Sequence, residues 1–70
     1  MLESSLKAVK LIKMLEAKHF EIKMVEFDDE YIEIRGNYDV VWFVYIYNIG
    51  KKELQLHCTG SILDTRKMEL

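Results

Sequence analysis

The adjacent residues His57 and Cys58 are the side chains in this sequence best suited to chemistry. They stand in a stretch, residues 53–59, where Leu54 and Leu56 alternate with polar side chains, and this alternation predicts a β-strand. Neighbouring side chains of a strand point to opposite faces, so this thiol and this imidazole cannot work together as nucleophile and base. Cys58 shares its face with the leucines and is predicted to be a buried small hydrophobe, with His57 on the solvent face.

The other side chains that could take part in chemistry are better explained as parts of turns and helix ends. His19 falls at the predicted end of a helix, where an imidazolium complements the helix dipole. The acidic run 28–30 lacks the alternating ligands and the glycine of a calcium loop, and it predicts a turn. Ser4, Ser5 and Ser61 stand where helix caps are expected, outside the glycine-flanked setting of a nucleophile elbow. No metal, cofactor or catalytic set is expected, so the chain is predicted not to be an enzyme.

Composition narrows the class of protein further. Seventy residues, 50% hydrophobic and 31% charged, predict a single globular domain over residues 1–70. The single cysteine excludes an internal disulfide and fits a reducing compartment. A net charge of −2 gives no overall field that favours nucleic acid or an acidic membrane. No apolar run approaches the ~18 residues of a membrane span, so no membrane partner is expected. Lysines interrupt the apolar residues at the start of the chain, so no signal peptide is expected and a cytoplasmic location is predicted.

The periodicity of apolar residues predicts the elements that hold these groups. Residues 4–18 read as a helix, with Ala8, Leu11, Ile12 and Leu15 on one side. From Phe20 the period changes to two, and a change of parity near Met24-Val25 predicts a β-bulge. Turns are expected at 28–30, 36–39 and 48–52, which leaves strands at 20–27, 31–35, 40–47 and 53–59.

After Gly60 the pattern changes again. Ser61 followed by Asp64 resembles a helix-capping box and predicts a short helix from residue 62 to about residue 68. The predicted order is α-β-β-β-β-α. This is an α+β fold in which the N-terminal helix packs on one face of a four-stranded antiparallel meander, with a short C-terminal helix.

The predicted strand 40–47 is unusual because both of its faces are apolar. One parity holds Val40, Trp42, Val44 and Ile46, and the other holds Val41, Phe43, Tyr45 and Tyr47. The wholly nonpolar parity is the better candidate for the core, so Trp42 is expected to pack against the apolar side of the helix. The opposite orientation, with Phe43 and the tyrosines inward, stays open.

In the favoured orientation an aromatic outer face remains to be covered. Its candidate binding residues are Phe43, Tyr45, Tyr47, Tyr31, Arg35 and His57. Three explanations are open: the C-terminal helix covers this face, two copies or a partner protein bury it, or single-stranded nucleic acid stacks its bases on it. Aromatic side chains are enriched in protein interfaces, whereas the acidic balance of the chain disfavours nucleic acid. A protein partner and a homodimer are therefore predicted, with single-stranded nucleic acid as the alternative.

In outline the chain resembles two groups of proteins. A helix followed by a meander resembles double-stranded RNA-binding modules, but the lysine-rich, glycine-flanked stretch that contacts phosphates in those domains is missing at Gly60-Ser61. In size, acidity and lack of catalytic residues the chain is similar to accessory or inhibitor proteins of phages and plasmids, which act by occupying a surface. Together these features predict a non-catalytic, self-associating protein-interaction module that acts through the aromatic face of its sheet.

Overall fold

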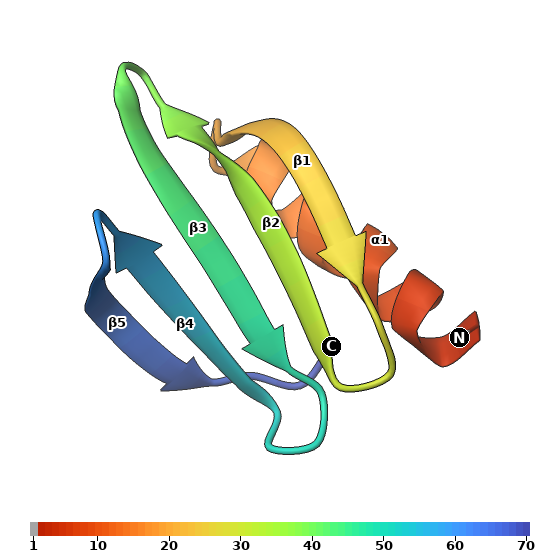
Figure 1. Ribbon diagram of the computed structural model, residues 1–70. Helices are drawn as coiled ribbons and strands as arrows, with labels where there is room; N and C mark the ends of the chain where they lie inside the picture. The colour runs from red at the N-terminus through yellow and green to blue at the C-terminus, as the bar shows by residue number, and fades with distance from the viewer. Residues whose placement is uncertain (1) are drawn as a thin grey trace.

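A computed structural model of the protein describes residues 2–70 (Figure 1). Along the chain lie α1 (Leu2–Ala17), β1 (Glu21–Phe27), β2 (Tyr31–Tyr38), β3 (Val41–Asn48), β4 (Glu53–Cys58) and β5 (Ser61–Lys67). The strands form a five-stranded antiparallel sheet in the order β1-β2-β3-β4-β5. The α+β class and the antiparallel meander are confirmed, whereas a fifth strand takes the place of the predicted C-terminal helix.

Helix α1 ends where the sequence predicts and turns the chain sharply into β1. Its residues Leu11 and Leu15 are fully buried against the sheet. The N–H of Phe20 donates to the carbonyl oxygen of Leu15 at 3.0 Å. The N–H of His19 donates to the carbonyl oxygen of Glu16 at 3.0 Å, and His19 has a φ of 67°. This pair of hydrogen bonds around a left-handed residue is a Schellman motif, and it places the ring of Phe20 in the core.

The C-terminal helix prediction is wrong because residues 59 and 60 form a tight hairpin turn. Thr59 and Gly60 have φ values of 47° and 82°, and two successive left-handed residues are the mark of a type I′ turn. Such a turn returns the chain along the strand it has just left, so Ser61 pairs with Cys58 and the ladder continues from there. The spacing from Ser61 to Asp64 that resembled a helix cap therefore lies within a strand.

Strand β2 is longer than predicted, because Gly36 belongs to it and not to a turn. The turn between β2 and β3 consists only of residues 39 and 40. A Cβ atom at position 36 would collide with the backbone oxygen of Glu21 and lie 2.8 Å from the ring of Phe20. Glycine therefore allows the start of β1 and the Phe20 ring to lie directly on β2.

The predicted bulge in β1 is present, slightly earlier in the strand. The register of β1 against β2 shifts between Ile22 and Met24, so the extra residue is Lys23. Before the shift Ile22 packs against the core, and after it Val25 does, which accounts for the change of parity in the sequence.

Strand pairing decides which apolar face of β3 meets the helix. Tyr47 lies opposite Ile32 of β2 and opposite Leu54 of β4. Directly paired residues share a face of the sheet, and all three of these side chains are buried, Tyr47 completely. The parity that contains Tyr45 and Tyr47 therefore points to the core. The expected inward orientation of Trp42 is wrong: this side chain is 59% exposed on the opposite face.

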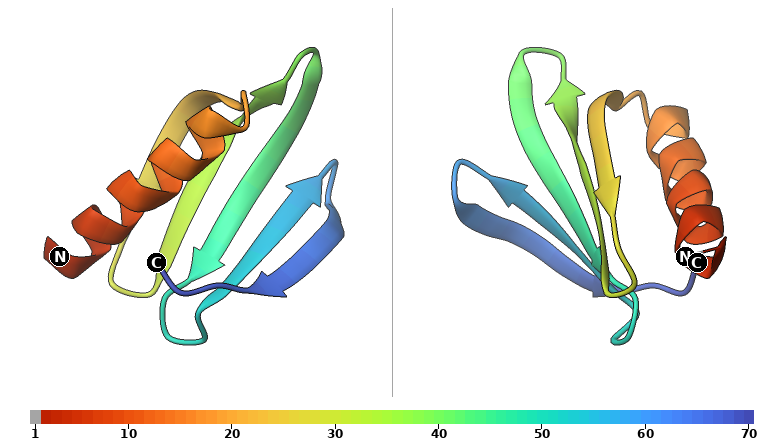
Figure 2. Two further views of the ribbon diagram at one scale, coloured as in Figure 1. Left: turned by 180° about the vertical axis from the view of Figure 1, so that it is seen from behind. Right: turned by 45° about the vertical axis from the view of Figure 1, so that its right-hand side comes forward.

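The helix covers only part of the inner face of the sheet. It packs against β1 and β2, whereas β4 and β5 extend beyond it (Figures 1 and 2). After β5, residues 68–70 turn back towards the helix. The hydroxyl of Tyr47 donates to the backbone oxygen of Met68 at 2.7 Å, and the Nζ atom of Lys7 donates to that of Leu70 at 3.1 Å. This last segment closes one end of the core.

Candidate interaction surface

The six residues predicted to form one binding face are divided between the two faces of the sheet. Phe43, Tyr45 and Tyr47 lie on the inner face with the core, and Tyr31, Arg35 and His57 lie on the outer face, away from α1. The expected exposure of the first three side chains is wrong. The hypothesis of an interaction surface on the outer face therefore depends on other residues of β3.

The aromatic side chains of the inner face are accommodated because their polar atoms have partners. The hydroxyl groups of Tyr38 and Tyr45 lie 2.8 Å apart and share a hydrogen bond. The ring of Phe20 contacts both, with centroid distances of 4.9 Å to Tyr38 and 5.1 Å to Tyr45. Burial, followed by the hydrogen bond to Tyr38, raises the pKa of Tyr45 well above its usual range. Tyr45 therefore stays neutral at physiological pH and serves the core.

The outer face carries a groove of about 500 Å³ near the start of β3. Its apolar lining includes Met24 from β1 and Trp42 and Val44 from β3. Met24 is 48% exposed, so the groove presents two large apolar side chains to solvent. A tryptophan on an open sheet face exposes a large apolar area, and such patches on soluble proteins mark interaction sites.

The polar residues at the edge of this groove include three nitrogen-containing side chains, from Lys23, Arg35 and His57, and no residue that lines it is acidic. The Nε atom of Arg35 donates to the carboxylate of Glu33 at 2.6 Å, and this contact raises the pKa of Arg35, which remains charged. Lys23 lies 3.4 Å from the carboxylate of Glu21. These ion pairs hold the cations beside the groove, because each acidic partner stands on the same strand as its cation.

The opposite end of the outer face has the opposite charge. Two smaller hollows there are both lined by Tyr31 and Ile46, and their acidic residues are Glu26, Asp28, Glu33 and Glu53. The outer face is therefore basic and apolar where β3 begins, and mainly acidic where it ends. This separation of charge gives the face a direction along the strands.

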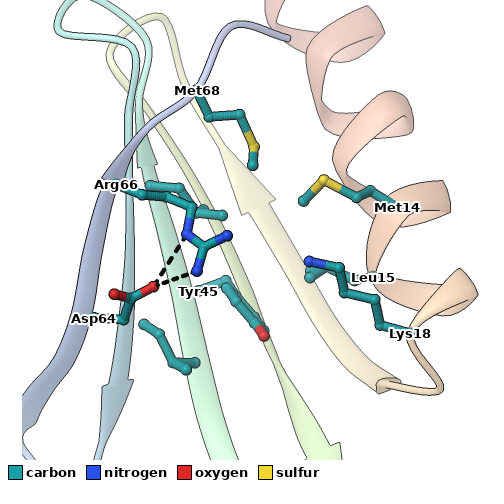
Figure 3. Close-up of a pocket in the computed structure, with 9 residues that line it drawn as sticks. Met14, Leu15, Lys18, Tyr45, Asp64, Arg66 and Met68 are labelled. Atoms are coloured by element: carbon teal, nitrogen blue, oxygen red, sulfur yellow. Dashed lines mark hydrogen bonds and ion pairs between the residues drawn. The ribbon is translucent and has the colours of Figure 1, made fainter.

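The inner face has a smaller cleft between α1 and the uncovered strands (Figure 3). Its volume is about 90 Å³, and Met14 and Lys18 of α1 face Tyr45 and Arg66 across it. The Nε atom of Arg66 donates a hydrogen bond to the carboxylate of Asp64 at 3.1 Å, and Nη2 of Arg66 forms an ion pair with the same oxygen at 3.0 Å. The main cation of the cleft is therefore already paired, and the space is too small for a drug-sized ligand.

The side chains with catalytic or metal-binding potential stay apart. Among residues 2–70, no three His, Cys, Asp or Glu side chains come together as a metal site. His57 lies on the outer face within 2.9 Å of the Gln55 side chain, whereas Cys58 is a half-buried free thiol on the neighbouring position of β4. No helix in the part of the chain that the structure describes is long and apolar enough to cross a membrane.

Trp42 and Met24, the two large exposed apolar side chains of the groove, are not among the binding residues predicted from the sequence. Hydrophobicity, the only criterion for orienting β3, places Trp42 in the core. The position of Met24 depends on the bulge in β1, which brings Lys23 and Met24 to the groove. Comparisons of the chain with known protein families, with curated proteins and with solved structures find no match.

Proposed function

We propose that the protein is a non-catalytic, self-associating interaction module that binds a partner protein in the outer groove around Trp42. The observation that carries this proposal is the exposed indole in a groove of about 500 Å³ with an apolar lining and cationic neighbours. Tryptophan and arginine are the side chains most enriched among residues that dominate binding energy at protein interfaces.

The chemistry of the groove specifies the kind of partner. Met24 and Val44 beside Trp42 favour an aliphatic or aromatic side chain, which would bury apolar area on all three. Lys23 and Arg35 favour carboxylates beside that side chain. Each is paired with one carboxylate of its own strand but has further N–H donors, and none of the described residues that line the groove is acidic. The expected partner segment is therefore an apolar residue flanked by aspartate or glutamate.

Peptide arrays test this proposal directly. One array presents apolar residues flanked by Asp and Glu, and a matched array carries Asn and Gln at the acidic positions. We expect binding to the acidic array, and Trp42→Ser should weaken it by about 2 kcal/mol, roughly thirty-fold in Kd. Tyr31→Ser is the matched control, because Tyr31 is an exposed aromatic at the acidic end of the same face. Equal binding to both arrays, or full binding by Trp42→Ser, would contradict the proposal.

A second candidate function is binding of single-stranded nucleic acid at the same groove. The observation that favours it is the position of Lys23 and Arg35 beside an exposed indole, because bases stack on aromatic rings while cations contact phosphates. The acidic end of the face, at Glu33 and Glu53, limits the length of strand that could follow it. Fluorescence titration with a thymidine oligonucleotide separates the two functions, since nucleic-acid binding should weaken steeply as salt rises.

A further inference from the structure

Strand β5 is an edge of the sheet that the described chain leaves open. It pairs with β4 on one side, and none of the described strands pairs with its other side. All seven of its residues are exposed, and α1 lies over the opposite part of the sheet (Figure 2). An open edge presents backbone N–H and C=O groups that can pair with an added strand.

The side chains of β5 specify which added strand fits. In an antiparallel pair, directly opposite residues lie on the same face of the sheet. Two identical strands related by a twofold axis meet this condition only if one residue lies opposite its own copy, and the axis then passes between these two copies. An axis at Thr65 places Asp64 of each copy opposite Arg66 of the other. An axis at Asp64 or at Arg66 would instead place two like charges directly opposite each other, which is unfavourable.

The local geometry of β5 favours the same centre. The ladder with β4 is interrupted at Leu63, where the register shifts, and it is regular from Asp64 to Lys67. Asp64 and Arg66 share the inner face and already form an ion pair at 3.0 Å. Pairing about Thr65 would set two such ion pairs side by side with alternating signs, and would bring the two Thr65 side chains together on the outer face.

We infer that two copies of the chain pair antiparallel through β5 about a twofold axis at Thr65, which joins their five-stranded sheets into one of ten strands. This axis is perpendicular to the sheet, so both helices lie on one face and both Trp42 grooves on the other. Helix α1 packs on β1 and β2 and leaves the junction open. The inference rests on the self-association in the proposed function and gives its interface, while the groove stays free for a partner.

Charge reversal tests the pairing. Sedimentation velocity compares the wild type, Asp64→Arg, Arg66→Asp and an equal mixture of the two variants. We expect the wild type to form a dimer and each variant alone to dimerise at least tenfold more weakly, because like charges then face each other. The mixture should restore a dimer of unlike chains, since the cations of one variant face the carboxylates of the other. A wild type that is monomeric up to about 1 mM, variants that dimerise like the wild type, or a mixture that stays monomeric would overturn the inference.

A cross-linking measurement keeps the test decisive if a charge-reversed variant fails to fold. Thr65→Cys, in a Cys58→Ser background, should form a disulfide between two copies on mild oxidation, because the axis brings these positions together. Lys67→Cys in the same background is the control on the same face, and it should cross-link at least tenfold less. Equal cross-linking at both positions would contradict an axis at Thr65. Failure of the peptide-binding test with Trp42→Ser would leave this result unchanged, so the two proposals fail separately.

Discussion

At the scale of single residues, Gly36 permits a close approach of β1 to β2. The backbone oxygen of Glu21 and the ring of Phe20 occupy the space that a side chain at position 36 would need. A methyl group there would displace a backbone segment and a buried aromatic ring at once. Overpacking of this kind usually costs about 1–3 kcal/mol, and a collision with backbone leaves little room for adjustment.

We therefore expect Gly36→Ala to lower the free energy of unfolding by about 3 kcal/mol, measured by urea denaturation. Gly50→Ala is the matched control. A Cβ atom at position 50 would meet only the side-chain oxygen of Asn48, at 3.6 Å, which is ordinary contact. This variant should lie within about 0.5 kcal/mol of the wild type. A similar loss in both variants would show that the close approach at Gly36 is not the cause.

At the scale of elements, one carboxylate helps to stabilise the turn between β1 and β2. The side chain of Asp28 accepts hydrogen bonds from the backbone N–H of Tyr31 at 2.8 Å and of Glu30 at 2.7 Å. These two bonds lower the pKa of Asp28 below its usual 3.8, since they favour the charged form. The acidic run 28–30, which the sequence predicts to be a turn, thus stabilises that turn through its first residue, Asp28.

The shifted pKa makes the stability of this turn depend on pH. Because the folded pKa lies below 3.8, the contribution of Asp28 is fully present above that pH and is lost as the pH falls through the folded value. We expect Asp28→Asn, which keeps the side-chain acceptor, to flatten the fall in stability below about pH 4. Urea denaturation over a series of pH values checks this, and an NMR titration of the Asp28 carboxyl gives its pKa directly. A wild type and variant that lose stability in parallel below pH 4 would contradict the prediction.

Hairpin geometry could have predicted the orientation of β3 where hydrophobicity misled. In the structure the two-residue turn at 39–40 places Ile34 opposite Tyr45. A four-residue turn at 36–39, as the sequence suggested, would place Ile34 opposite Val41, which has the same parity as Tyr45. Either turn therefore orients the aromatic parity inward with the isoleucines. The more apolar parity therefore lies on the outer face, where Trp42 and Val44 line the groove.

The remaining differences come from local geometry that a pattern of apolar residues does not contain. Periodicity alone predicts the helix and the inward residues of α1. It also predicts that the first three turns connect neighbouring strands. Strand β5 did not, because its residues are exposed on both faces and carry no alternation. The outer groove did not either, since it depends on the orientation of β3 and on the bulge at Lys23.

At the scale of the whole molecule, one helix is too narrow for a five-stranded sheet, and the last residues complete the core. Met68 and Leu70 pack against the buried cluster, although they lie outside any strand or helix. The N–H of Met68 donates to the backbone oxygen of Lys52 at 2.8 Å, which ties this segment to the turn before β4. Three separate hydrogen bonds thus join the end of the chain to α1, β3 and the turn between β3 and β4.

The hydroxyl of Tyr47 is the contact through which β3 holds this closing segment. Tyr47 is fully buried, and its hydroxyl donates to the backbone oxygen of Met68 at 2.7 Å. We expect Tyr47→Phe to cost about 1–1.5 kcal/mol of unfolding free energy, since the ring remains and only the hydrogen bond is lost. Hydrogen exchange at the Met68 N–H should quicken as well, because the segment opens more readily. Tyr31→Phe, which changes an exposed tyrosine of the outer face, should alter neither quantity. If Tyr47→Phe leaves both unchanged, this hydroxyl does not hold the closing segment, and the other two hydrogen bonds and the apolar contacts suffice.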